Sequence, residues 1–115
     1  MPSQSRKYRG YESQRIVAER LRELWPLAEP TGAGRQGKDI LAVPGIAPEV
    51  KAQANIAIPA FIKQAKANAG DEMPVLILRL NGQGPASIDD WPVVMRMGDW
   101  MDLMGYKISP LDQEF

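Results

Sequence analysis

Apolar residues recur at helical spacing in three segments of the chain, which predicts three helices. In the first segment Val17, Leu21 and Leu24 lie at positions i, i+4 and i+7, and charged residues occupy the other faces. Pro26 ends this helix, because proline cannot continue the helical hydrogen-bond pattern. The predicted helices cover about residues 10–25, 59–69 and 98–104, the last with Trp100, Leu103 and Met104 facing inward.

Four further segments have the hydrophobic pattern of strands. The segment MPVLILRL is apolar almost throughout, which is typical of a central strand covered on both faces. Pro44 and Gly45 separate the first two segments, which predicts a turn and therefore a hairpin. The predicted strands cover residues 39–43, 46–53, 73–80 and 91–97. The element order α-β-β-α-β-β-α, with a mixed central sheet, predicts an α/β protein and a three-layer α-β-α domain.

The length of 115 residues suits one domain. We expect this domain to span residues 1–115, with a flexible basic arm over residues 1–7 and an irregular tail over residues 105–115. The longest apolar segment is much shorter than the roughly 18 residues that a membrane span needs, and the first ten residues lack the apolar core of a signal peptide. These features predict a soluble protein of the cytoplasm.

The composition removes several kinds of chemistry. The chain contains no cysteine and no histidine, which excludes thiolate nucleophiles, imidazole bases, histidine-ligated zinc and Ser-His-Asp triads. Any catalysis must therefore use carboxylates, lysine, hydroxyl groups or a hard cation held by oxygen ligands.

The net charge of zero hides an uneven distribution. Eight basic and four acidic residues lie between Met1 and Lys38, a net charge of +4, so the remainder of the chain carries −4. A basic front suits a protein that meets a polyanion through one surface. Scattered, solvated charge explains the same numbers equally well.

Two acidic residues and a lysine come together on the predicted hairpin. Glu49 and Lys51 are two positions apart on one strand, so their side chains share a face, and Val50 turns to the core. Asp39 begins the preceding strand, and strand pairing brings its carboxylate toward Glu49. Two adjacent carboxylates repel each other unless a cation lies between them, and Mg²⁺ or Mn²⁺ suits that position. Lys51 can orient water or neutralise charge on a phosphate, and Glu12 of the first helix can add a carboxylate.

Each of these residues also has an ordinary structural explanation. Glu12 can complement the dipole of its helix, and Asp39 can cap the glycine-rich loop. Glu49 and Lys51 can form a surface ion pair worth at most about 1 kcal/mol. The triplet of an acidic residue, any residue and lysine is a weak signal by itself.

Six motifs together carry a resemblance. They are RGYE (residues 9–12), PTGAG (30–34), KDI (38–40), EVKAQ (49–53), MPVLILRL (73–80) and WPVVMRMGDWMDLM (91–104). The chain resembles the PD-(D/E)xK nuclease superfamily, which has the restriction-endonuclease-like fold. Within it the chain is most similar to the Holliday junction resolvases of the archaeal type and their phage relatives. The likeness covers about residues 6–104.

The resemblance implies roles for particular residues. The implied catalytic residues are Glu12, Thr31, Asp39, Glu49 and Lys51. The implied metal ligands are Asp39, Glu49, the carbonyl of Val50, and Glu12. The basic residues expected to contact DNA phosphates are Arg6, Lys7, Arg9, Arg35 and Lys38. Lys38 stands where the family usually has proline.

The activity that the resemblance implies is phosphodiester hydrolysis. We expect a Mg²⁺-dependent, structure-selective DNA endonuclease, for which Mn²⁺ can substitute, acting as a Holliday junction resolvase in recombination, repair or phage DNA processing. Two coordinated cuts imply a symmetric homodimer, with its apolar surface on the second helix or on Trp91, Trp100 and the methionine-rich end. The alternatives are another small nuclease of this fold, such as a nickase or a single-strand-selective enzyme, and a non-catalytic DNA-binding module.

Overall fold

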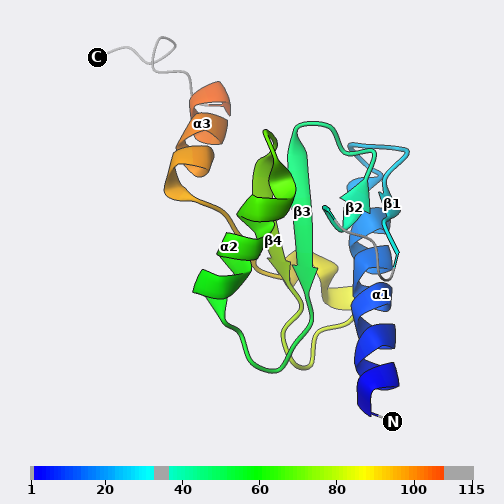
Figure 1. Ribbon diagram of the computed structural model, residues 1–115. Coiled ribbons are helices and arrows are strands. Elements are labelled where there is room, and N and C mark those ends of the chain that lie inside the picture. The colour runs from blue at the N-terminus through cyan, green and yellow to red at the C-terminus, as the bar shows by residue number, and fades with distance from the viewer. Residues whose placement is uncertain (1, 33–36, 108–115) are drawn as a thin grey trace.

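A computed structural model describes residues 2–32 and 37–107 of the chain (Figure 1). The helices are α1 (Pro2–Leu21), α2 (Ile58–Ala69) and α3 (Met97–Lys107), with a 3₁₀ helix η1 (Pro85–Asp90). The strands are β1 (Glu29–Pro30), β2 (Ile40–Leu41), β3 (Ile46–Lys51), β4 (Met73–Leu78) and β5 (Val93–Val94). The predicted mixed α/β class is therefore confirmed. No helix within the described ranges is both long enough and apolar enough to span a bilayer.

The main sheet has three strands in the order β3-β4-β5. β3 and β4 are parallel, with Glu49 opposite Leu76 and Lys51 opposite Leu78, and β5 is antiparallel to β4. α2 connects β3 to β4, as a parallel pair requires a crossover. The prediction that the apolar segment after residue 72 forms a central strand is confirmed.

The two faces of this sheet are covered by different helices. Val75 and Ile77 of β4 pack in one cluster with Ile16 and Val17 of α1. Leu76 and Leu78 point to the opposite face of the sheet, because side chains alternate along a strand. They pack with Phe61 of α2. α1 and α2 therefore lie on opposite faces of the sheet, with α2 on the near side in Figure 1.

The predicted hairpin of the first two strands is wrong. β2 pairs with β1 in a separate two-stranded sheet, in which Pro30 lies opposite Ile40, whereas β3 pairs with β4. The turn itself is present, since Ile46 donates a backbone hydrogen bond to Val43 and Gly45 has a φ of 97°. A turn after β2 therefore does not require β2 to join the same ladder as β3.

The ends of α2 agree with the sequence prediction, whereas both ends of α1 differ from it. α2 begins and ends close to the predicted residues, with proline in its first turn and Gly70 immediately after it at a φ of 59°. α1 begins at Pro2, so that residues 2–7, expected as an arm, are helical, and it ends at Leu21 rather than near Trp25. Leu24, expected on its inner face, is exposed in the turn beyond.

α3 stands away from the rest of the molecule in Figure 1. Trp100 and Leu103, which were expected to face inward, are both exposed on it. The strand expected before it is reduced to the two residues of β5. Residues 105–107, expected as part of the tail, belong to α3, and residues 108–115 lie outside the described residues.

Candidate functional site

Glu49 and Lys51 lie on the face of β3 that is covered by α2. Lys51 Nζ is 3.8 Å from Glu49 Oε1 and 5.2 Å from the centre of the Phe61 ring. Asn68 of α2 donates a hydrogen bond of 3.4 Å to Glu49 Oε2. The prediction that Glu49 and Lys51 share a face, with Val50 in the core, is confirmed.

Asp39 is held against the free edge of β3 by hydrogen bonds. Its N–H donates to the carbonyl of Pro48 at 2.9 Å, and its own carbonyl accepts from the N–H of Thr31 at 2.8 Å. Its carboxylate oxygen Oδ2 accepts from the N–H of Val50 at 2.7 Å. The N–H and C=O of one strand residue point to the same edge, because paired residues exchange both bonds. The carbonyl of Val50 therefore faces the same edge as Asp39.

Both carboxyl groups are displaced from their ordinary titration range in the same direction. Burial raises the pKa of Asp39, and this is opposed by the hydrogen bond from Val50 and by the charge of Lys51. Burial also raises the pKa of Glu49, and the negative charge of Asp39 raises it further. Lys51 and Asn68 oppose the rise in the pKa of Glu49. A half-buried and a buried carboxyl group that each resist ionisation form a pair that a cation would relieve.

The raised pKa values predict how Asp39 affects stability. Above its ordinary pKa, the unfolded state has lost the Asp39 proton while the folded state still holds it, so the free energy of unfolding falls as pH rises through the raised pKa. Asp39→Asn is therefore expected to raise the free energy of unfolding at pH 7 by about 1 kcal/mol. This gain should shrink as pH falls toward the ordinary carboxyl pKa. Urea unfolding between pH 4 and pH 8 measures both effects.

Glu72→Gln is the control, because it is expected to change the free energy of unfolding in the opposite direction. The hydrogen bond from Lys38 lowers the pKa of Glu72, so its stabilisation is present at neutral pH and is lost as pH falls through the lowered pKa. Glu72→Gln is therefore expected to be less stable than wild type at pH 7. An Asp39→Asn variant that is also less stable at pH 7 contradicts the electrostatic interpretation of the pair.

The oxygen atoms at this site are of the chemical kind that a hard divalent cation binds. The donor set consists of the carboxylates of Asp39 and Glu49 and the backbone carbonyl of Val50, and carboxylate and carbonyl oxygens are what Mg²⁺ prefers. No group of three or more His, Cys, Asp or Glu side chains that could hold a metal occurs among the described residues. Any metal held here would therefore have two carboxylate ligands from this chain, the carbonyl, and water.

Glu12 is placed in a different cluster, on the α1 side of the sheet. Its Oε1 lies 3.3 Å from Nη1 of Arg79, the residue after β4. Arg79 also donates to Ser13 Oγ at 3.1 Å and to the carbonyl of Gln83 at 2.9 Å, and its guanidinium lies 5.4 Å from the Trp91 ring. The structure thus does not bring Glu12 together with the other two carboxylates into one metal-binding group.

The remaining predicted site residues have separate positions. The Thr31 hydroxyl donates to the carbonyl of Lys38 at 2.5 Å, which braces the segment that carries Asp39. Lys38 forms an ion pair of 2.8 Å with Glu72, so its charge is partnered within the fold. Of the other residues expected to contact DNA, Arg35 and the side chains of Arg6 and Lys7 lie outside the described part of the chain.

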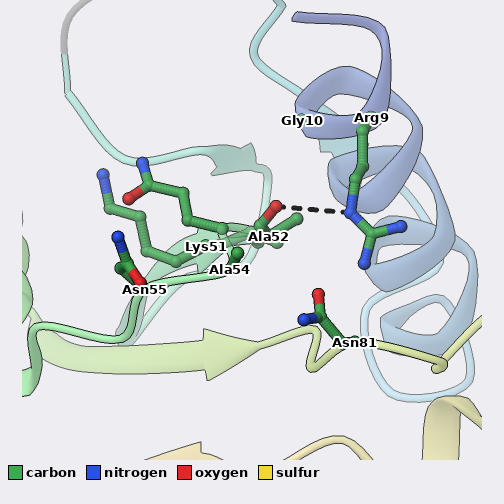
Figure 2. Close-up of a pocket in the computed structure, with 9 residues that line it drawn as sticks. Arg9, Gly10, Lys51, Ala52, Ala54, Asn55 and Asn81 are labelled. Atoms are coloured by element: carbon green, nitrogen blue, oxygen red, sulfur yellow. Dashed lines mark hydrogen bonds between the residues drawn. The ribbon is translucent and has the colours of Figure 1, made fainter. Parts of the chain in front are cut away.

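Arg9 lies at a cleft at the carboxyl ends of β3 and β4. Its Nε donates to the carbonyl of Ala52 at 3.3 Å, the bond drawn as a dashed line in Figure 2. Lys51, the last residue of β3, also lines this cleft. Open α/β sheets bind their ligands at the carboxyl ends of parallel strands. The cleft adjoins the Asp39–Glu49–Lys51 cluster through Lys51, at the carboxyl end of β3.

Two residues near these clusters were missed in the sequence. Arg79 follows Val75 and Ile77 at strand spacing, so a charged residue in a helix-facing position was the signal for a buried ion pair. Asn68 gives no such signal, because it contacts Glu49 only after α2 packs on the sheet.

Comparison of the chain with family models, with curated proteins and with solved structures finds no match.

Proposed function

We propose that this protein is a Mg²⁺-dependent endonuclease that hydrolyses phosphodiester bonds in branched DNA. The observation that carries the proposal is the proximity of Asp39, bound at the edge of β3, to Glu49 and Lys51 on its α2-covered face. Two carboxyl groups of raised pKa lie close together, and the ammonium group of Lys51 is 3.8 Å from Glu49 Oε1. Paired carboxylates that share a cation, next to a lysine, are suited to stabilising the charge that develops on a phosphate.

Each residue has a distinct task in this proposal. Asp39, Glu49 and the carbonyl of Val50 would hold the Mg²⁺, which would supply Lewis-acid activation of the phosphate and of water. Lys51 presents its ammonium group beside the same oxygens, where it orients water and neutralises charge on the phosphate. The Phe61 ring and Glu49 together restrict the ammonium position. Thr31 positions Asp39 through the segment between them.

The choice of branched DNA rests on the resemblance of the motifs to Holliday junction resolvases. Arg9 at the mouth of the cleft supports a nucleic-acid substrate, since a guanidinium is a strong phosphate ligand. The net charge of +4 over residues 1–38 has the same implication.

The proposal is tested by cleavage of three end-labelled DNA substrates, namely a synthetic four-way junction, a linear duplex and a single strand. We expect Mg²⁺-dependent, paired nicks in the junction, and no cleavage when EDTA removes the metal. Cleavage of only the linear substrates would assign the chain to another nuclease class. Junction binding without cleavage in Mg²⁺ or Mn²⁺ would show a non-catalytic DNA-binding module.

We also propose that the active form is a homodimer joined through α3. Trp91, one of the residues expected at the interface, is 4% exposed and belongs to the core, whereas Trp100 is 46% exposed. Met97 and Met101 are exposed on the same side of α3 as Trp100, since the spacing i, i+3, i+4 places these three residues on one helical face. The outer face of α2, by contrast, carries mainly lysine, glutamine and alanine. A contiguous apolar face of this kind on a small protein is typical of an interaction surface.

A double variant Trp100→Glu/Met101→Glu is expected to convert the dimer to a monomer, because the charges cannot be buried against a second copy. Size-exclusion chromatography with light scattering at about 10 μM gives the mass directly. Leu24→Glu is the matched control, because Leu24 is a still more exposed apolar residue at the end of α1. An equal mass for wild type and double variant contradicts the role of α3.

A further inference from the structure

The cleft at the carboxyl ends of β3 and β4 has a volume of about 720 Å³. Its walls come from four parts of the fold, namely α1, the end of β3, the loop after β3, and the turn after β4 (Figure 2). The polar side chains that line it are Arg9, Lys51, Gln53, Asn55 and Asn81. Neither catalytic carboxylate is part of its lining, so the cleft is an extension of the candidate active site beyond the cluster itself.

The charge of this lining is positive. Arg9 and Lys51 are basic, and no acidic residue is among the described residues that line the cleft. Arg9 uses Nε to hold the carbonyl of Ala52, and within the described part of the chain it has no carboxylate partner. Its two terminal nitrogens are therefore available to an anion. A phosphate group matches this position, because a guanidinium donates two parallel hydrogen bonds to it.

The other polar side chains of the lining are carboxamides. Gln53, Asn55 and Asn81 are all exposed, and each carboxamide offers both a donor and an acceptor. Asn and Gln use this combination to read the edge of a base. Figure 2 shows the Asn81 carboxamide on the same side of the cleft as Arg9, and Asn55 on the side of Lys51. The cleft thus combines phosphate ligands with groups that match base edges.

The size of the cleft decides between a duplex and a single strand. A cavity of about 720 Å³ lies within the range that encloses one ligand of moderate size. A duplex, whose major groove alone is about 12 Å wide, can lie only across such a cavity. A nucleotide that has left the duplex can enter it, and a base that is already unpaired costs the least to move out of the stack.

We infer that the cleft binds one unpaired nucleotide of the substrate strand beside the scissile phosphate, with its phosphate on Arg9 and its base edge on Asn55 and Asn81. This inference rests on the proposed function, and it defines the substrate as DNA with an unpaired nucleotide next to the cut. Selectivity for branched DNA then arises from the opened strand and requires no sequence recognition.

The test measures binding in EDTA, where no cleavage occurs. Two fluorescent duplexes of equal length are compared, one with a single-nucleotide bulge and one fully paired. Wild type is expected to bind the bulged duplex about tenfold more tightly. Asn55→Ala/Asn81→Ala is expected to lose that preference while binding the paired duplex as before, because about two hydrogen bonds to the base are removed. Gln64→Ala, an exposed carboxamide on the outer face of α2, should change neither affinity.

Arg9→Gln separates the phosphate contact from the base contact. It is expected to weaken both duplexes and to reduce the slope of log affinity against log salt by about one. The inference is overturned if wild type binds the two duplexes with equal affinity. It is also overturned if the asparagine double variant loses the same factor of affinity for the bulged and for the paired duplex. Cleavage in Mg²⁺ without a bulge preference removes this inference alone. A bulge preference without cleavage of any substrate removes the proposed hydrolysis and leaves the cleft assignment standing.

Discussion

Asp39→Asn is expected to reduce Mg²⁺-dependent cleavage of the junction by about a thousandfold while junction binding persists. The substitution removes one of the two carboxylates of the proposed cation site but keeps an oxygen that can accept the hydrogen bond from Val50. The folded structure is therefore retained, and the stability gain expected at pH 7 gives an independent check of folding. Single-turnover cleavage and binding by anisotropy measure the two properties separately.

Lys51→Ala should give a loss of about a hundredfold or more, because the ammonium beside Glu49 is removed. Lys63→Ala is the matched control, since Lys63 is an exposed lysine on α2. If Asp39→Asn cleaves at the wild-type rate, the two carboxylates are structural and the hydrolase proposal fails. Loss of cleavage, binding and folding together leads to the same conclusion.

Arg79→Ala is expected to produce the largest loss of stability, about 3 kcal/mol. The Arg79 side chain is 8% exposed and joins α1, β4 and the turn before η1 through Glu12, Ser13 and Gln83. Its removal leaves Glu12 without its partner in a partly buried position. For a domain whose total stability is about 5–15 kcal/mol, this is a large fraction.

Arg96→Ala provides the comparison for the buried arginine. Arg96 pairs with Asp99 three residues later on the surface, and an exposed pair of this kind contributes less than about 0.5 kcal/mol. Chemical denaturation of the two variants measures the difference. A loss below about 1 kcal/mol for Arg79→Ala would show that the cluster is dispensable for the fold.

Local patterns predicted the elements whose stability depends on their own residues. β4 was evident from its apolar composition, because a strand buried on both faces leaves no polar positions. α2 was evident from the proline near its start and the glycine at its end, since both act on the backbone directly. The shared face of Glu49 and Lys51 followed from the period of two along a strand.

Long-range choices were predicted less well. The turn between β2 and β3 is where the sequence predicts it, but β2 pairs with β1 and β3 pairs with β4. A turn sequence carries no information about which strands pair. The periodicity that includes Leu24 is the same for a buried and an exposed residue, so the end of α1 at Leu21 was not evident. Likewise, the apolar face of α3 indicates burial against some surface without saying whether that surface belongs to the same chain.

The sequence by itself determined which chemistry is available and that Glu49 and Lys51 share one face of their strand. Absence of histidine and cysteine restricts any catalysis to carboxylates, hydroxyls, lysine or a cation held by oxygen ligands, and strand geometry orients Glu49 with Lys51. Asp39 was expected near Glu49, but only the tertiary structure decided that it gets there by its own hydrogen bonds to β3 and without a hairpin ladder. Only the tertiary structure, too, decided that Glu12 pairs with Arg79. The physical reason is that backbone geometry acts over a few residues, whereas the neighbours of a carboxylate depend on how distant segments pack around a common core.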